Sequence, residues 1–174
     1  MGDPFQQAFT WADIARIRKK CPIPMIIKGI ATAEDARIAV DHGVEVVYVS
    51  NHGGRQLDHG RGSVADLPEV VDAVKGKCQI AVDGGIYRGT DIVKAIALGA
   101  DIVGIGRLQG LALAAGGEEA LTRALELLED ETRRVLGLLG VTSFAQLDRS
   151  YLAHATPLSR RGFDSPFPLI KEGY

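Results

Sequence analysis

The sequence contains few cysteines, few aromatic residues and no long run of like charge. It has 2 cysteines in 174 residues, and aromatic side chains make up 6%. Cys21 and Cys78 lack the CxxC spacing of a metal site, so we expect two buried free thiols in a reducing cytosol and no metal. The net charge of −2 and the lack of a basic run longer than residues 16–20 argue against nucleic acid or an anionic membrane as the main partner.

Targeting signals are also missing from the sequence. No signal peptide or membrane-spanning run is recognisable, and the chain ends in KEGY, which is not a peroxisomal address, so we expect a cytoplasmic location. Hydrophobic residues make up 46% and charged residues 24%, the composition of an ordinary globular domain with a core.

Short apolar runs alternate with helical patterns along most of the chain. The apolar runs cover residues 25–30, 44–49, 79–82 and 101–105, and helical patterns cover 33–42, 67–74 and 90–98. This alternation predicts parallel strands connected by crossover helices. Gly43 and Gly99 each follow a helical pattern directly, where a glycine commonly closes a helix.

An internal repeat supports the same architecture. A shift of 56 positions superposes Gly29 on Gly85, and Gly43 on Gly99. Two repeated strand-helix-strand modules favour a (β/α) barrel over a doubly wound sheet. Such a barrel has eight strands and typically about 250 residues, whereas four strands are predicted here, so the chain corresponds to half a barrel.

The rest of the sequence predicts helices and an arm. Residues 118–139 form a long amphipathic pattern, and residues 142–147 predict a short helix capped by Thr142 or Ser143. We therefore expect a half-barrel domain over residues 1–152 and an extended, proline-containing arm over residues 153–174.

Candidate functional residues follow the predicted strands. Reacting groups of (β/α) barrels lie at the C-terminal ends of the strands. Lys28 is costly to bury unless it meets an anion, and the glycines at 84–85 and 104–106 allow backbone amides to approach a ligand. Residues at the four strand ends are therefore the candidates: Lys28, Ser50, His52, Arg55, Asp83, Gly84, Gly85, Tyr87, Arg88, Gly106 and Arg107. The remaining histidines, at positions 42, 59 and 154, are expected at the surface.

Four motifs occur in an order and at a spacing that resemble one known family. SNHGGRQLD, KGI, DGGIYRGTD and GIGR are similar to the motifs of FMN-dependent 2-hydroxy acid oxidases and dehydrogenases, a family that includes glycolate oxidase, flavin lactate dehydrogenases and mandelate dehydrogenase. The resemblance extends to about Leu152. It implies the last four βα units of a TIM (β/α)8 barrel, FMN as cofactor, and oxidation of a 2-hydroxy acid to a 2-oxo acid.

The resemblance also implies a role for each candidate. His52 matches the base, since an imidazole titrates near neutrality, and Arg55 matches the residue that binds the substrate carboxylate with its planar fork. Lys28 matches the cation at the pyrimidine edge of the flavin, and Ser50 a flavin contact. The segment that holds the ribityl chain and phosphate matches Asp83, Gly84, Gly85, Gly106 and Arg107. Tyr87 and Arg88 stand where many relatives have two arginines, and Leu108 stands where many have proline.

The family's first half-barrel has no counterpart in this sequence. That half supplies substrate-binding tyrosines and an aspartate that pairs with the base. We therefore expect the N-terminal half of the barrel or a second copy of the chain as partner, an oligomer, and no activity from the isolated chain. The isolated chain would expose the inward faces of five residues, namely Ile26, Val47, Val49, Val82 and Ile105.

Two other functions are compatible with the residues. A non-catalytic half-barrel could bind flavin or a protein partner. Another FMN-dependent barrel enzyme, such as one similar to inosinate dehydrogenase, would share the phosphate-binding glycines. That class requires a catalytic cysteine, and neither Cys21 nor Cys78 follows a predicted strand.

Overall fold

The computed structural model describes residues 8–57 and 59–155. The predicted arm lies outside the described residues from position 156 onward. The described elements, in chain order, are α2 (Trp11–Lys20), β1 (Ile26–Ile30), α3 (Ala33–Asp41), β2 (Val46–Val49), the 3-10 turn η1 (His52–Gly54), α4 (Ser63–Val74), β3 (Gln79–Val82), α5 (Gly89–Ala97), β4 (Ile102–Val103), α6 (Arg107–Leu139), and the 3-10 turns η2 (Phe144–Gln146) and η3 (Arg149–Tyr151).

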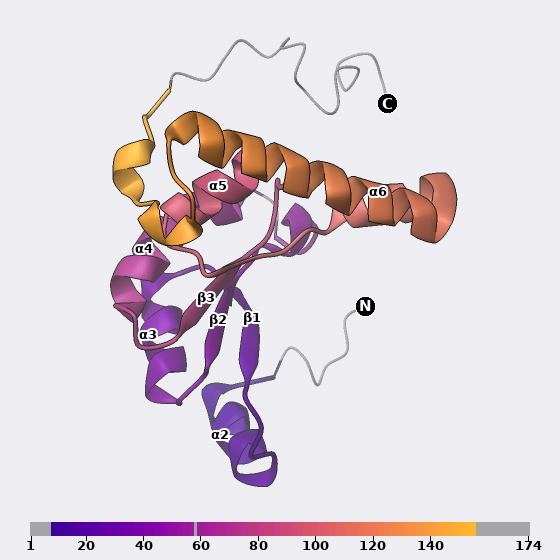
Figure 1. Ribbon diagram of the computed structural model, residues 1–174. Coiled ribbons are helices and arrows are strands. Elements are labelled where there is room, and N and C mark those ends of the chain that lie inside the picture. Colours follow the sequence, from indigo (N-terminus) through magenta and orange to yellow (C-terminus); the bar gives the residue numbers. More distant parts are fainter. Residues whose placement is uncertain (1–7, 58, 156–174) are drawn as a thin grey trace.

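The four strands form one parallel sheet in the order β1-β2-β3-β4 (Figure 1). Each crossover helix therefore moves the chain to the adjacent strand, as in the wall of a (β/α) barrel. This arrangement confirms the predicted parallel βα units. The strands lie within the predicted runs, although β4 is shorter than its run and α4 begins four positions earlier than predicted.

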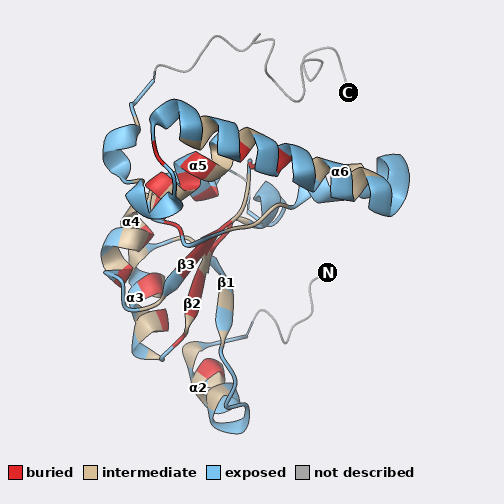
Figure 2. Cartoon of the chain, in the orientation of Figure 1, coloured by how far each residue is buried: buried red, intermediate tan, exposed pale blue. Residues whose placement is uncertain are grey.

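The hydrophobic core lies between the sheet and the helices that cover one of its faces (Figure 2). Val47, Val49 and Val82 are fully buried in this core, so their predicted place on the inward face is wrong. Side chains alternate along a strand, but alternation alone does not say which set meets the helices. The opposite set starts with Ile26, which is 59% exposed as predicted, and includes Ile102, which is 43% exposed.

The repeated modules have the same local devices at corresponding positions. Gly43 and Gly99 follow α3 and α5 with φ of +70° and +109°, a left-handed conformation that favours glycine and ends both helices. Asp35 and Asp91 lie in the first turns of those helices, where a carboxylate interacts favourably with the helix dipole. The sequence repeat is therefore a structural repeat.

Helix α2 was not predicted from the sequence. Its N-terminus is capped by Thr10, whose backbone N–H donates to Asp13 Oδ2 at 2.9 Å. Near the other end, Arg18 donates to Glu45 Oε2 at 2.7 Å, and Glu45 also accepts from Met25 N at 2.7 Å. These hydrogen bonds lower the pKa of Glu45 to about 2. They connect α2 to the N-terminal ends of β1 and β2.

Two surface or burial predictions are wrong near this helix. The ring of His42 lies 5.4 Å from that of Trp11, and its Nδ1 lies 2.9 Å from Ile38 O, so His42 is half-buried between α2 and α3. Cys21, which ends α2, is exposed, and Cys78 is half-buried; both are free thiols. Burial raises the pKa of the Cys78 thiol.

Helix α6 has a sharp break in its first third. Gly116 and Gly117 depart from helical φ and ψ, and regular helix resumes at Glu118, which is where the long amphipathic pattern begins. Ser143 caps the short turn η2 as predicted. Within the described part of the chain, no helix is long and apolar enough to cross a membrane.

Candidate functional site

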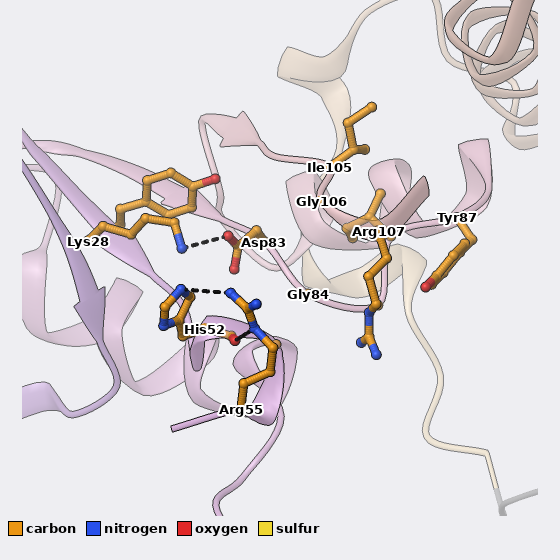
Figure 3. Close-up of a pocket in the computed structure, with 13 residues that line it drawn as sticks. Lys28, His52, Arg55, Asp83, Gly84, Tyr87, Ile105, Gly106 and Arg107 are labelled. Carbon is orange, nitrogen blue, oxygen red and sulfur yellow. Dashed lines mark hydrogen bonds and ion pairs between the residues drawn. The ribbon is translucent and has the colours of Figure 1, made fainter. Parts of the chain in front are cut away.

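A pocket of about 530 Å³ lies at the C-terminal ends of the strands (Figure 3). Its wall combines inward-facing strand residues with the loops that follow β2, β3 and β4. The lining residues are Lys28, Tyr48, His52, Gly53, Arg55, Asp83, Gly84, Gly85, Ile86, Tyr87, Ile105, Gly106 and Arg107. The structure thus brings nine of the eleven predicted site residues to one cavity, and Ser50 and Arg88 lie outside its lining.

The loop after β2 places an imidazole beside a guanidinium. His52, Gly53 and Gly54 have φ of +56°, +71° and +71°, and two glycines make this run of left-handed residues affordable. The chain therefore turns tightly, and Arg55 Nη2 lies 3.0 Å from His52 Nε2. Arg55 Nε also donates a hydrogen bond to His52 O at 3.3 Å.

The contacts of His52 define its tautomer. A guanidinium can only donate, so His52 Nε2 is the acceptor in its contact with Arg55. A neutral imidazole then carries its proton on Nδ1, which lies 3.1 Å from the side-chain amide of Gln56. Turning that amide over presents its oxygen to Nδ1–H, an assignment that the hydrogen-bond network determines. In this tautomer the Nε2 lone pair, which a base requires, is directed at Arg55.

Lys28 lines the pocket between a serine and a carboxylate. Its Nζ donates to Ser50 Oγ at 2.7 Å and lies 2.9 Å from Asp83 Oδ2 (Figure 3). Ser50 is only 3% exposed, and its Oγ also accepts from His52 N at 3.1 Å. Ser50 therefore sits behind the pocket and connects the Lys28 ammonium to the loop that carries His52.

Tyr48 is a pocket residue that the sequence analysis missed. Lys28 Nζ lies 4.9 Å from the centre of its ring, which is within the range of a cation–π contact. Burial raises the pKa of Tyr48, and the Asp83 carboxylate raises it further. One signal was available in the sequence: Tyr48 interrupts the apolar run VVYVS two positions before Ser50, on the strand face opposite to Val47 and Val49.

The loops after β3 and β4 supply open backbone. A Cβ placed on Gly85 or Gly106 would meet no atom within 4 Å, so the backbone at both positions borders open space in the pocket. Arg107 begins α6, and no ion pair joins it to another residue in ranges 8–57 and 59–155. A helix N-terminus with open backbone and an arginine is suited to an anion such as phosphate.

Two neighbouring predicted residues point in different directions. Tyr87 lines the pocket. Arg88 is turned toward α6, where its Nη2 lies 2.8 Å from Glu131 Oε1 and its Nε donates to the same carboxylate at 2.9 Å. These hydrogen bonds, together with one from Gly89 N, lower the pKa of Glu131. The structure therefore gives Arg88 a contact between helices, and its predicted role at the cofactor has no support from its position.

Comparisons with known proteins agree on one family. Residues 1–154 match the family described as FMN-dependent dehydrogenase. L-lactate oxidase of Nostoc sp. is 43% identical over 145 residues, covering 83% of this chain and 40% of that protein. Glycolate oxidase of Spinacia oleracea is 42% identical over 147 residues, covering 84% of this chain and 40% of that protein.

Solved structures give the same result. A crystal structure of mandelate oxidase with benzoyl-formic acid superposes with a TM-score of 0.76 at 46% identity, covering 79% of this chain and 41% of that one. A mandelate oxidase mutant with an FMN adduct superposes equally well. The chain thus spans about 40% of the length of the relatives it matches, as expected for half of a TIM barrel.

Proposed function

The chain belongs to the FMN-dependent dehydrogenase family, and from this we propose that it is the flavin- and carboxylate-binding C-terminal half of an enzyme that oxidises a 2-hydroxy acid to the 2-oxo acid. The observation that carries the proposal is the contact between His52 Nε2 and Arg55 Nη2, 3.0 Å long, at the pocket that Lys28 also lines. A base, a carboxylate-binding fork and a cation beside the cofactor are the groups that this oxidation requires.

The shape and chemistry of the pocket fit FMN. Its volume of about 530 Å³ is within the range of cofactor sites. The free space beside Gly85 and Gly106 would admit a phosphate to their amides, and Arg107 would neutralise it. The remaining predicted cofactor contacts, from Gly84 and Tyr87, border the same space.

Arg55 and His52 would act in sequence on the substrate. The substrate carboxylate would take the two-pronged contact of Arg55, because a guanidinium pairs more strongly with a carboxylate than with a neutral imidazole. Arg55 would then leave His52 Nε2 free to accept a proton from the substrate. The resting contact between the two residues would thus be exchanged for a contact between Arg55 and the substrate carboxylate.

The cation of Lys28 would stabilise negative charge at the cofactor. When bound, FMN supplies the acceptor for the two electrons that leave the substrate. Lys28, held by Ser50 and Asp83, would face the part of the cofactor that becomes negative.

A second half-barrel is part of this proposal. Within the described residues, β1 and β4 are the edges of the sheet, and unpaired edges of a parallel sheet are prone to association. The N-terminal half of the barrel would pair both edges and cover Ile26 and Ile102. A second copy of this chain is the alternative partner, and an oligomer remains a prediction. We also keep the cytoplasmic location as a proposal, although one relative is described as a peroxisomal hydroxyacid oxidase.

A cysteine-dependent FMN enzyme is disfavoured by the positions of the thiols. Cys21 ends α2 and Cys78 immediately precedes β3, so both lie at the N-terminal ends of strands, opposite to the pocket. Such an enzyme needs its thiol at the pocket.

The visible spectrum of the purified protein, completed by its second half, tests the proposed function. Bound oxidised FMN should absorb, and the band should bleach anaerobically when short or aromatic 2-hydroxy acids are added. A flavin spectrum that no 2-hydroxy acid bleaches would favour a non-catalytic flavin-binding half-barrel. A protein that takes up no flavin would contradict the proposal.

A further inference from the structure

We propose that Tyr48 and Asp83 are positioning residues that hold the Lys28 ammonium in one place within the pocket. The inference rests on the proposed function for its effect on the cofactor, but its geometry is independent of any cofactor. Tyr48 supplies a ring face for the ammonium and Asp83 supplies an anion, so that Lys28 is fixed from two sides.

Strand register brings these residues together. Lys28 of β1 pairs with Tyr48 of β2, which pairs in turn with Ala81 of β3. All three therefore lie in one layer on the inward face of the sheet. Ala81 is small and 2% exposed, and it leaves room beside it for the larger ring of Tyr48.

The glycine at position 104 fixes where the Tyr48 hydroxyl lies. A Cβ placed on Gly104 would lie 3.3 Å from Tyr48 Cζ and 3.3 Å from Asp83 Cβ, and closer still to the Tyr48 hydroxyl oxygen. The hydroxyl therefore occupies the space that any side chain at position 104 would take. It lies beside Asp83, whose Oδ2 binds Lys28 and whose buried Oδ1 has no hydrogen-bond partner in ranges 8–57 and 59–155.

These contacts give Lys28 one defined position. A lysine side chain has several rotamers that would otherwise move its charge by several ångströms. Ser50, Asp83 and the Tyr48 ring each approach the same ammonium. A cation near a developing negative charge is effective only when its position is fixed in advance, so Tyr48 would influence the cofactor through Lys28 without touching the reacting atoms.

The first experiment needs no flavin. In the completed apo barrel, NMR of ring-labelled tyrosine should give Tyr48 a pKa above its ordinary value of 10.0. Asp83→Asn should lower that pKa because the carboxylate raises it, whereas Asp72→Asn, at an exposed carboxylate paired with Arg149, should leave it unchanged. The other titratable groups that line the pocket are Lys28, His52, Arg55, Tyr87 and Arg107, and all are retained in both variants. An unchanged Tyr48 pKa in Asp83→Asn would overturn the contact.

The second experiment measures the effect at the cofactor. Sulfite adds reversibly to oxidised flavin and bleaches its visible band, and a nearby cation stabilises the negative charge that results. Lys28→Met in the FMN-loaded barrel sets the full loss of sulfite affinity. Tyr48→Phe, which keeps a ring, should weaken sulfite binding about three- to tenfold, and Tyr48→Leu should weaken it by about tenfold or more.

Controls separate positioning from folding and from the proposed function. Tyr151→Phe, at a partly exposed tyrosine away from the pocket, should bind sulfite as the unmodified protein does. Wild-type sulfite affinity in Tyr48→Leu, or an equal fall of FMN and sulfite affinity in Tyr48→Phe, would show that Tyr48 only packs the barrel. A wild-type barrel that binds no FMN would refute the proposed function, and the NMR titration would still decide the contact between Tyr48 and Asp83.

Discussion

Strands β2 and β4 occupy equivalent places in the two modules but contribute opposite kinds of surface. The shift of 56 positions superposes Tyr48 on Gly104 and Ser50 on Gly106. On β2 and directly after it, these positions carry side chains that contact Lys28. Just after β4, the same positions are glycines: Gly104 leaves space for the Tyr48 hydroxyl, and Gly106 borders open space at the pocket.

The two modules have the same backbone arrangement, but their strand ends contribute different chemical groups to the one pocket. The loop after β2 brings His52 and Arg55, the side chains suited to the substrate. The end of β4 brings bare backbone and Arg107, which are suited to a phosphate. Substitutions at the two strand ends should therefore have separable effects, on chemistry in one case and on cofactor retention in the other.

The strongest test removes the base from the β2 side. In the completed barrel, His52→Ala should keep its FMN but reduce it about 10²–10⁴-fold more slowly with substrate, the usual contribution of a general base. Stopped-flow bleaching of the flavin measures the rate, and the flavin-to-protein absorbance ratio is the control. Bleaching at nearly the wild-type rate would refute the role of His52.

Gly43 and Gly99, which end α3 and α5 in the two modules, can be compared directly by substitution with alanine. Gly99→Ala should destabilise the protein by about 2–4 kcal/mol, since it adds a left-handed alanine and a Cβ 2.8 Å from Val71 Cγ1. Gly43→Ala adds the same strain, but its nearest contact is Arg18 Nη2 at 3.7 Å, so about 1–2 kcal/mol is expected. Denaturant unfolding compares the two, and equal losses would contradict the role of Val71.

The β4 side is tested through cofactor affinity. Arg107→Ala should weaken FMN binding by about 1.5–3 kcal/mol, the strength of a charge-assisted hydrogen bond, whereas Tyr87→Phe should weaken it by about 0.5–1.5 kcal/mol. Fluorescence titration with FMN and with riboflavin separates phosphate recognition from ring binding. A comparable loss of riboflavin affinity in Arg107→Ala would rule out a phosphate contact.

A conservative change at Arg55 tests further whether substrate binding and cofactor binding depend on different strand ends. Arg55→Lys should weaken substrate binding about tenfold, because a point charge loses one prong of the carboxylate contact, and it should leave FMN content unchanged. Substrate affinity comes from the concentration dependence of flavin bleaching. Parallel loss of substrate and flavin would mean that Arg55 serves the cofactor or the fold.

The smallest effect is expected at the opposite end of the sheet. Glu45 has a folded-state pKa of about 2 against 4.5 ordinarily, so its ion pair with Arg18 stabilises the protein fully above pH 4.5. That contribution falls as the pH falls from 4.5 toward 2. Glu45→Gln should therefore flatten the acid side of a stability profile slightly and leave flavin binding unchanged, and a profile identical to that of the wild type would show that the exposed pair contributes nothing.

The site residues that could be predicted best are charged residues at the ends of apolar strands. Lys28, His52, Arg55 and Arg107 stand at strand ends or beside glycines, and parallel strand ends meet at one edge of a sheet, so their convergence was predictable. Helix α2 was missed because half of its ten residues are charged and only Ile14 is buried, although Trp11, Ile14 and Ile17 recur at helical spacing.

Other features of the structure depend on information that is not local. The faces of Val47 and Val49 were reversed because alternation gives two equivalent answers until the helices are placed. Lys28 pairs with Tyr48 in the sheet, so both side chains lie on the same face. Because these two side chains are polar, that face is the one that points away from the helices. The orientation of Arg88 depends on Glu131, which lies 43 positions later in the chain, and no neighbouring residue indicates it.

The bond from Gly89 N to Glu131 Oε2, 2.8 Å long, has a consequence for the order in which the protein is made. Helix α3 is capped by Thr32, which immediately precedes it, and can close as soon as it leaves the ribosome. Helix α5 has a local contact as well, from Arg88 N to Asp91 Oδ2, but the N–H of its first residue, Gly89, waits for a carboxylate 42 positions downstream, which takes about 2–8 s to be made at typical rates of synthesis. The first module can therefore mature during translation, while the second stays incomplete until α6 has been synthesised.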